Sequence, residues 1–168
     1  MTQTLGVALR SLSFFAVLVV AGCSAAFSVG DVDAIDFPTL SLAETPNQYL
    51  VCPPDLCREA PVDRASPIFS VDETALRAAW ESLVAAAPRS TRAAEFKDGR
   101  QVAYVQRTAV FKFPDIISVE FFALDDGRST IAIYSRSVYG RSDFGVNQKR
   151  IMTWLEQLAE ALEGRAGR

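Results

Sequence analysis

Apolar side chains recur at helical spacing in two segments of the chain. The first segment should begin near Ser70, because Ser70 and Glu73 form the Ser-x-x-Glu pattern of a capping box, and it should end at Pro88. Its apolar face consists of Leu76, Ala79, Trp80, Leu83 and Val84. The second segment spans residues 147–163, and its apolar stripe consists of Ile151, Trp154, Leu155, Leu158 and Leu162. Both patterns predict amphipathic helices that pack one face on a core.

Between these helices, three segments are rich in the β-branched and aromatic residues that favour strands, namely residues 101–113, 116–124 and 129–139. Alternation in the first segment places Ala103, Val105, Ala109, Phe111 and Phe113 on one face. In the second segment, alternation places Ile117, Val119, Phe121 and Ala123 on one face. Residues 125–127, Asp-Asp-Gly, predict a tight turn. The chain is therefore predicted to be α+β, an antiparallel β-meander of three to four strands with two amphipathic helices packed on one face.

The N-terminal segment has the layout of a secretory signal. Arg10 precedes an apolar stretch over residues 11–20, and small residues lead from there to Cys23. Residues 20–23, Val-Ala-Gly-Cys, resemble a bacterial lipobox, which implies a signal peptide at residues 1–22 and fatty acyl chains, such as palmitate, on Cys23. One alternative is an uncleaved membrane helix, because no charge follows until Asp31, and another is an ordinary cleaved signal. The expected location is the bacterial cell envelope, facing the periplasm or the exterior.

Residues 23–46 show little periodicity and are predicted to be a lipid-anchored flexible tether. A globular domain should follow at residues 47–164, with an edge strand near Tyr49 and a C-terminal tail at 165–168. Cys52 and Cys57 are the cysteines that remain once Cys23 is acylated, and in an oxidising compartment they are expected to form a disulfide. A redox or metal-binding pair is the alternative, although the spacing is not that of a C-x-x-C motif.

The composition excludes several functions. The 168 residues include 17 basic and 20 acidic side chains, and the formal charge of −3 disfavours nucleic-acid binding. The sequence contains no histidine, which excludes Ser-His-Asp and Cys-His catalytic sites and zinc sites of the histidine type. We expect neither a metal ion nor another cofactor, and a non-catalytic protein is the leading interpretation.

Polar residues are densest at 135–150, where a predicted strand passes through a loop into the last helix. Lys149 and Arg150 occupy the first helical turn, where the helix dipole disfavours positive charge, so we expect them to have partners. One interpretation is a structural network in which Asp143 caps the helix or pairs with Arg136 or Arg150. The other is a site for a carboxylate, a phosphate or a glycan-linked anion at the helix N-terminus. The candidate residues for an anion or a partner are Arg107, Ser135, Arg136, Ser137, Arg141, Ser142, Asp143, Asn147, Lys149 and Arg150.

Several short stretches resemble a bacterial family named domain of unknown function 1499. They are Phe-Pro-Asp at 113–115, Ser-Arg-Ser at 135–137, Ser-Asp-Phe-Gly-Val-Asn at 142–147 and Lys-Arg-Ile at 149–151. The resemblance covers residues 47–162. Members of the family are often predicted lipoproteins or small membrane proteins, which agrees with the signal at the N-terminus. The resemblance implies no reaction and no active site.

These observations predict an exported, lipid-anchored envelope protein that acts as a non-catalytic binding or scaffold module. Its expected partners are the membrane, through the lipid anchor, and an anionic small molecule or an envelope protein. The alternative is an envelope hydrolase or transferase with Ser135, Ser137 or Ser142 as nucleophile, Lys149 as base and Asp143 as orienting group. That chemistry needs one of the hydroxyls within hydrogen-bond reach of Lys149 inside a pocket.

Overall fold

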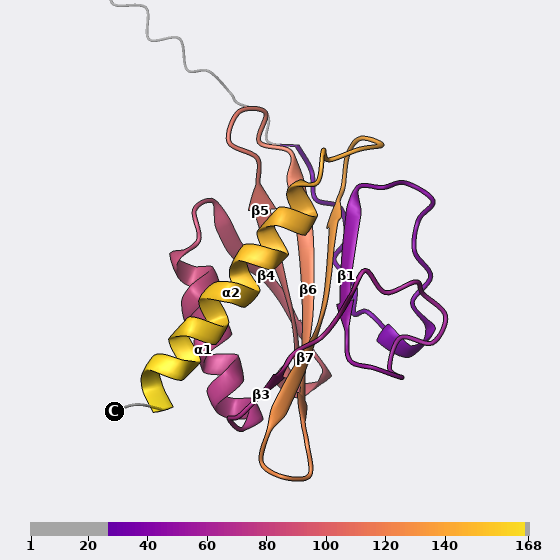
Figure 1. Cartoon of the computed structure of the whole chain (residues 1–168). Helices are drawn as coiled ribbons and strands as arrows, with labels where there is room; N and C mark the ends of the chain where they lie inside the picture. The colour runs from indigo at the N-terminus through magenta and orange to yellow at the C-terminus, as the bar shows by residue number, and fades with distance from the viewer. Residues whose placement is uncertain (1–26, 167–168) are drawn as a thin grey trace, which may run out of the picture.

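Alternating residues in the second half of the chain build a β-sheet, and two amphipathic helices cover one of its faces (Figure 1). The computed structural model describes residues 27–166. Its elements in chain order are η1 (Phe37–Thr39), β1 (Gln48–Cys52), β2 (Arg64–Ala65), β3 (Ile68–Phe69), α1 (Glu73–Ala86), β4 (Ser90–Phe96), η2 (Lys97–Gly99), β5 (Gln101–Arg107), β6 (Pro114–Ala123), β7 (Ser129–Ser137) and α2 (Val146–Ala166). The predicted α+β class is confirmed.

The sheet is larger than the predicted meander of three to four strands. It has seven strands, in the order β2-β1-β7-β6-β5-β4, and β3 pairs with β7 outside this path. Strands β4 to β7 pair antiparallel with their neighbours, as β1 does with β7, whereas β1 and β2 are parallel and make the sheet mixed. Because β2 pairs with the outer side of β1, β1 is not an edge strand, and the prediction of an edge strand near Tyr49 is wrong.

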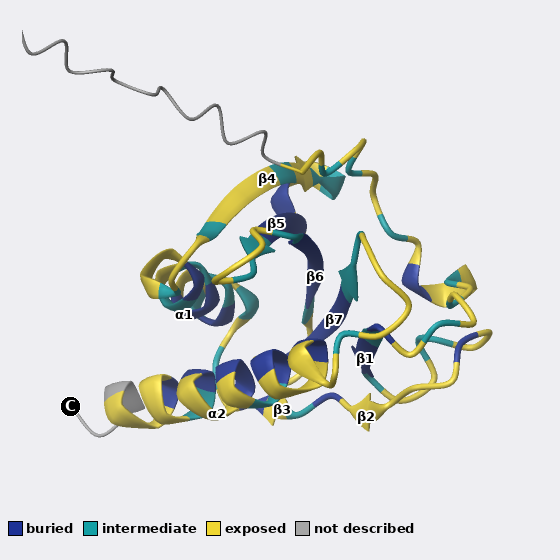
Figure 2. Cartoon of the chain, turned by 90° about the horizontal axis from the view of Figure 1, so that it is seen from above, coloured by how far each residue is buried: buried dark blue, intermediate teal, exposed yellow. Residues whose placement is uncertain are grey.

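The two helices lie on the same face, and the sheet curves around them (Figure 2). The core between the layers combines helix residues such as Leu76, Trp80 and Leu158 with strand residues such as Val119 and Ile133. Apolar burial of this extent is the main stabilising term of such a domain. It confirms the predicted apolar faces of both helices.

Helix α1 begins two residues later than the predicted capping box requires. Asp72 is the N-cap, and its carboxylate accepts a hydrogen bond of 2.8 Å from the Ala75 amide. Ser70 lies outside the helix and is exposed, so the prediction of a Ser70 cap is wrong. Aspartate caps as well as serine, and its charge also suits the positive end of the helix dipole.

The first predicted strand ends early, and another strand was not predicted. β5 stops at Arg107, after which the Thr108 amide donates to the Phe113 carbonyl and closes a loop over residues 108–113. Phe111 is thus exposed and not in the core. The unpredicted strand β4 is an edge strand with a register shift between Arg92 and Ala94, and its mostly exposed residues carry little apolar signal.

The segment before β1, over residues 35–42, covers the opposite face of the sheet. Phe37 is fully buried there, and the Gln101 side chain bonds both the amide and the carbonyl of Ile35, at 2.7 and 2.8 Å. Part of the segment predicted to be a flexible tether is therefore packed on the domain. The Cys52–Cys57 disulfide closes the loop that follows β1, which confirms the predicted bridge.

Within residues 27–166, no helix combines the length and the apolar character that crossing a membrane requires. The predicted signal peptide and Cys23 lie outside the described residues, and their roles stay predictions.

Candidate functional site

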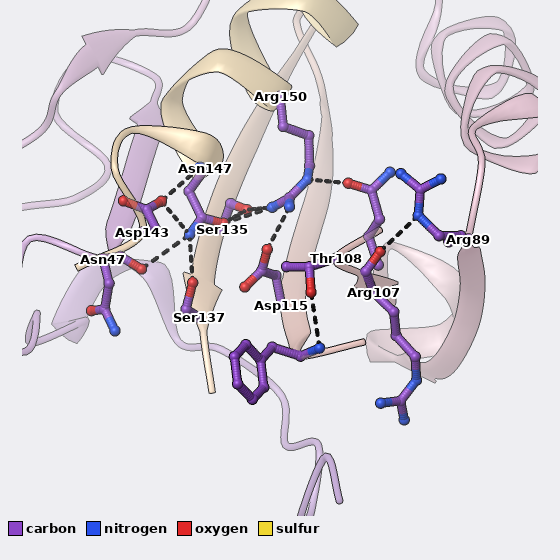
Figure 3. A network of polar contacts seen from close by, with 12 residues as sticks. Asn47, Arg89, Arg107, Thr108, Asp115, Ser135, Ser137, Asp143, Asn147 and Arg150 are labelled. Atoms are coloured by element: carbon purple, nitrogen blue, oxygen red, sulfur yellow. Dashed lines mark hydrogen bonds and ion pairs between the residues drawn. The ribbon is translucent and has the colours of Figure 1, made fainter. Parts of the chain in front are cut away.

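The helix-facing side of the sheet changes from apolar to polar near the start of α2. Strand pairing places Gln106, Asp115 and Ser137 side by side across β5, β6 and β7. Beside them, the carbonyl of Asn47 accepts a 2.9 Å hydrogen bond from the Ser137 amide. The next position along β6 on the same face is Ile117, in the apolar core. A row of polar groups thus lies beneath the first turn of α2 (Figure 3).

Arg150 extends from α2 into this row and is buried. Its Nη2 lies 2.5 Å from Oδ2 of Asp115, and both side chains are less than a tenth exposed. Its Nε donates to Gln106, and its Nη1 donates to Ser135 at 3.1 Å and to Asn147 at 2.7 Å. A buried ion pair needs such additional hydrogen bonds to offset its desolvation. The expectation that basic residues in this turn have partners is confirmed for Arg150.

Asn147 joins α2 to β7 and to the residue before β1. Its Nδ2 donates to the carbonyl of Asn47 at 3.0 Å, to Ser137 at 3.1 Å and to Asp143 at 2.7 Å. Its Oδ1 accepts from the Ser135 hydroxyl at 2.6 Å, in addition to Arg150. Asn147 is fully buried, and all of its polar atoms are satisfied.

Asp143 caps α2 and shapes the loop before it. Its two carboxylate oxygens accept from the backbone amides of Asn147, at 2.7 Å, and Gly145, at 3.0 Å. The helix N-terminus therefore already holds a carboxylate of the same chain. The turn gives Phe144 a φ of 54° and Gly145 a φ of 77°. A left-handed conformation suits glycine but strains phenylalanine, and it leaves Phe144 97% exposed.

Phe144 borders an apolar groove of about 480 Å³ between the loops 108–113 and 138–145. The described residues expose eight large apolar side chains. Five of them line this groove, and a sixth, Phe27, packs against its lining residues Phe113 and Tyr139. These six are Phe27, Val110, Phe111, Tyr139, Phe144 and Val146. We name this surface, formed by residue 27 and residues 108–113 and 138–146, the loop end. A concentration of exposed apolar groups on one surface is typical of an interaction site.

Residues 41–158, more than two thirds of the chain, match the family described as Protein of unknown function (DUF1499). The chain belongs to the DUF1499 family. The resemblance seen in the sequence is thereby confirmed, and the match includes the polar network and, apart from Phe27, the loop end. A search of curated proteins found no match. Since the family description supplies no reaction, function has to be inferred from geometry.

The DUF1499 domain brings together half of the predicted site residues. The five that meet in the network are Ser135, Ser137, Asp143, Asn147 and Arg150. Asp143 caps the helix, as one interpretation predicted, but the acidic partner of Arg150 is Asp115 and not Asp143.

The other five predicted residues do not join the network. Arg136 follows Ser135 on β7, so alternation places its side chain on the opposite face of the sheet. Arg107 donates from Nη1 to the carbonyls of Phe27 and Lys112, at 2.9 and 3.0 Å. The remaining three are exposed and comprise Arg141, Ser142 and Lys149.

The geometry needed by the hydrolase or transferase alternative does not occur in the described part of the chain. No hydrogen bond there joins Lys149 to Ser135, Ser137 or Ser142. Lys149 borders a different hollow, of about 570 Å³, which none of the three serines lines. Residues 27–166 also contain no group of three or more His, Cys, Asp or Glu side chains placed to hold a metal ion.

Sequence reasoning missed Asp115, Gln106 and Asn47 in the network. A signal for Asp115 existed, because it has the same strand parity as Ile117 and Val119 and so had to face the helices. No comparable signal existed for Asn47, whose position depends on the pairing of β1 with β7.

Proposed function

We propose that this chain is exported to the bacterial cell envelope, held at a membrane by lipid on Cys23, and that its domain is a non-catalytic binding module. The binding surface is the loop end. One observation carries the proposal: Phe27, four residues after Cys23, packs its ring on Phe113 and Tyr139, with centroids 4.6 and 5.4 Å apart. The described chain therefore starts at the loop end, beside the loops that follow β5 and β7 (Figure 1).

The polar network supports a structural role for the charged residues and leaves the loop end as the interaction surface. Arg150 donates to Gln106, Asp115, Ser135 and Asn147, so its guanidinium is committed within the domain. The carboxylate of Asp143 occupies the helix N-terminus, where a free anion would otherwise bind. Buried and fully bonded groups of this kind stabilise one arrangement of the loops.

The loop end has the properties of a binding surface. Val110 and Phe111 are 77% and 66% exposed at the tip of one loop, and Phe144 stands at the tip of the other. Keeping these side chains in water forgoes the free energy that their burial would supply. The loops that carry them are held by hydrogen bonds, including those between Thr108 and Phe113. A rigid apolar surface loses little conformational entropy on binding.

Metabolic labelling tests the anchor. Cells that express the full chain are grown with an alkynyl fatty acid, and the protein is examined for label and for its intact mass. We expect the wild type to be labelled and to begin at Cys23, and the Cys23→Ala variant to be unlabelled. Equal labelling of both proteins, or a wild type without lipid, would overturn the anchored function.

Site-specific photocrosslinking tests the binding surface. The photoreactive residue benzoylphenylalanine replaces Phe144 in the full chain, and in a matched control it replaces Ile68. Ile68 is also an exposed apolar residue, but it pairs with Thr130 near the opposite end of β7. We expect adducts from position 144 and few from position 68. Similar yields from both positions would contradict the assignment of the loop end.

A further inference from the structure

We propose that the partner of the loop end is the lipid bilayer itself: the tips of its two loops insert into the headgroup region of the membrane that holds the anchor. This inference rests on the proposed function, because it takes the lipid on Cys23 as given. The membrane is then the surface to which the domain is bound, and the domain is oriented with its loop end toward the bilayer.

The length of the connection limits where the domain can be. Cys23 and Phe27 are four positions apart, a distance of at most about 14 Å when the chain is fully extended. Phe27 does not swing freely on this connection, because its carbonyl accepts from Arg107 and its ring contacts Phe113. The Tyr139 hydroxyl holds the next residue by donating to the Ser28 carbonyl at 2.8 Å. An anchored Cys23 therefore keeps the loop end, and not another face, close to the bilayer.

The side chains at the loop tips suit the membrane interface. Val110, Phe111 and Phe144 project from two separate loops that flank one groove. Lys112 and Phe144 both have positive φ, 58° and 54°, so a strained residue lies in each loop. Exposed aromatic and aliphatic groups of this kind bury in the boundary between headgroups and acyl chains.

The charges at the loop end favour an anionic lipid surface, although the whole chain has a formal charge of −3. Arg107, Lys112 and Arg141 lie in or next to the two loops. The acidic groups in or next to these two loops, Asp115 and Asp143, are engaged inside the domain by Arg150 and by the backbone of α2. Long basic side chains near a membrane keep their charge at the headgroups while their stems contact apolar material.

A second copy of the chain is a less suitable partner for this surface. A two-fold dimer through the loop end would place the same patch on both sides. Both copies would then bring Lys112 and Arg141 into the same interface, and like charges in an interface are unfavourable. A bilayer with anionic lipids supplies the opposite charge.

Fluorescence quenching tests the docking. The lipidated full chain is placed in vesicles of phosphatidylethanolamine and phosphatidylglycerol, with and without brominated acyl chains, as the wild type and as Phe111→Trp, Phe144→Trp and Ile68→Trp. Trp80 and Trp154 are buried and supply the same background in every variant. We expect the added emission of the Phe111→Trp and Phe144→Trp variants to be strongly quenched by brominated lipid, and that of Ile68→Trp to be unchanged. Adding Lys112→Glu and Arg141→Glu to Phe144→Trp should weaken the quenching.

The outcomes separate the two proposals. The intact mass before reconstitution shows whether Cys23 is acylated, and a chain without lipid overturns the proposed function. An acylated, vesicle-bound chain whose Phe144→Trp variant is quenched no more than Ile68→Trp overturns the docking alone. In the photocrosslinking experiment, an adduct with a protein at position 144 instead of an adduct with lipid would also overturn the docking and would indicate a protein partner.

Discussion

The ion pair between Arg150 and Asp115 should be a large single contribution to the stability of this domain. Their side chains are 6% and 3% exposed, and Arg150 bonds three further groups. The variant Arg150→Met retains much of the side-chain volume but leaves the Asp115 carboxylate buried without its cation. Removing one member of such a pair costs about 3 to 5 kcal/mol. Since small domains have free energies of unfolding of about 5 to 15 kcal/mol, this variant should lose a large share of its stability.

Urea unfolding measures the loss, because the edge-to-face Trp80–Trp154 pair, with centroids 5.7 Å apart, reports on the core by fluorescence. The double variant Asp115→Asn, Arg150→Met should be less destabilised than the sum of the two single variants, since it leaves no unpaired buried charge. Arg128→Met is the matched control, because the Arg128–Asp126 pair is about half exposed on both sides and should contribute little. Two results would refute a buried, coupled pair. One is a loss of unfolding free energy from Arg150→Met that is as small as the loss from Arg128→Met. The other is a double variant whose loss equals the sum of the losses of the two single variants.

Two further predictions concern the disulfide and a buried tyrosine. Reducing the Cys52–Cys57 bridge should lower the free energy of unfolding by about 2 kcal/mol, which is the entropic contribution expected of a disulfide that closes so short a loop. In the control variant Cys52→Ser, Cys57→Ser, the urea midpoint should not change when reductant is added. Burial, with a further contribution from Glu81, raises the pKa of Tyr104 to about 12. Above pH 10 the unfolded chain then loses this proton while the folded chain keeps it, so stability should fall from pH 10 to pH 12 by about 2 kcal/mol. Tyr104→Phe should remove that part of the slope, and an unchanged slope would contradict it.

The features that sequence analysis predicted depend on residues close together in the chain. The stripe of α2 repeats over several turns, and such a pattern identifies the buried face without knowledge of what covers it. The disulfide joins cysteines only five positions apart. Asp143 and Asn147 are likewise separated by one helical turn, so a cap between them was foreseeable. The polar cluster itself was therefore recognised, with a structural network and an anion-binding site as its two alternative interpretations.

The missed features depend on pairing between distant residues. The acidic partner of Arg150 is 35 positions away, and it meets Arg150 only because β6 lies between β5 and β7. The edge strand β4 escaped prediction for a related reason: its residues are mostly exposed, so its conformation depends on pairing with β5 and not on an apolar pattern.

The error at residues 108–113 has a consequence for function. Alternating apolar residues there were interpreted as a continuing strand, because a core is the usual reason for such a pattern. The Thr108–Phe113 hydrogen bonds instead close a loop, and Lys112 takes a left-handed conformation that a strand would not permit. Val110 and Phe111 then have no core to enter. Apolar side chains that the fold itself leaves in water are available to another partner, and if Cys23 is acylated as proposed, the nearest apolar phase is the membrane that would hold its acyl chains.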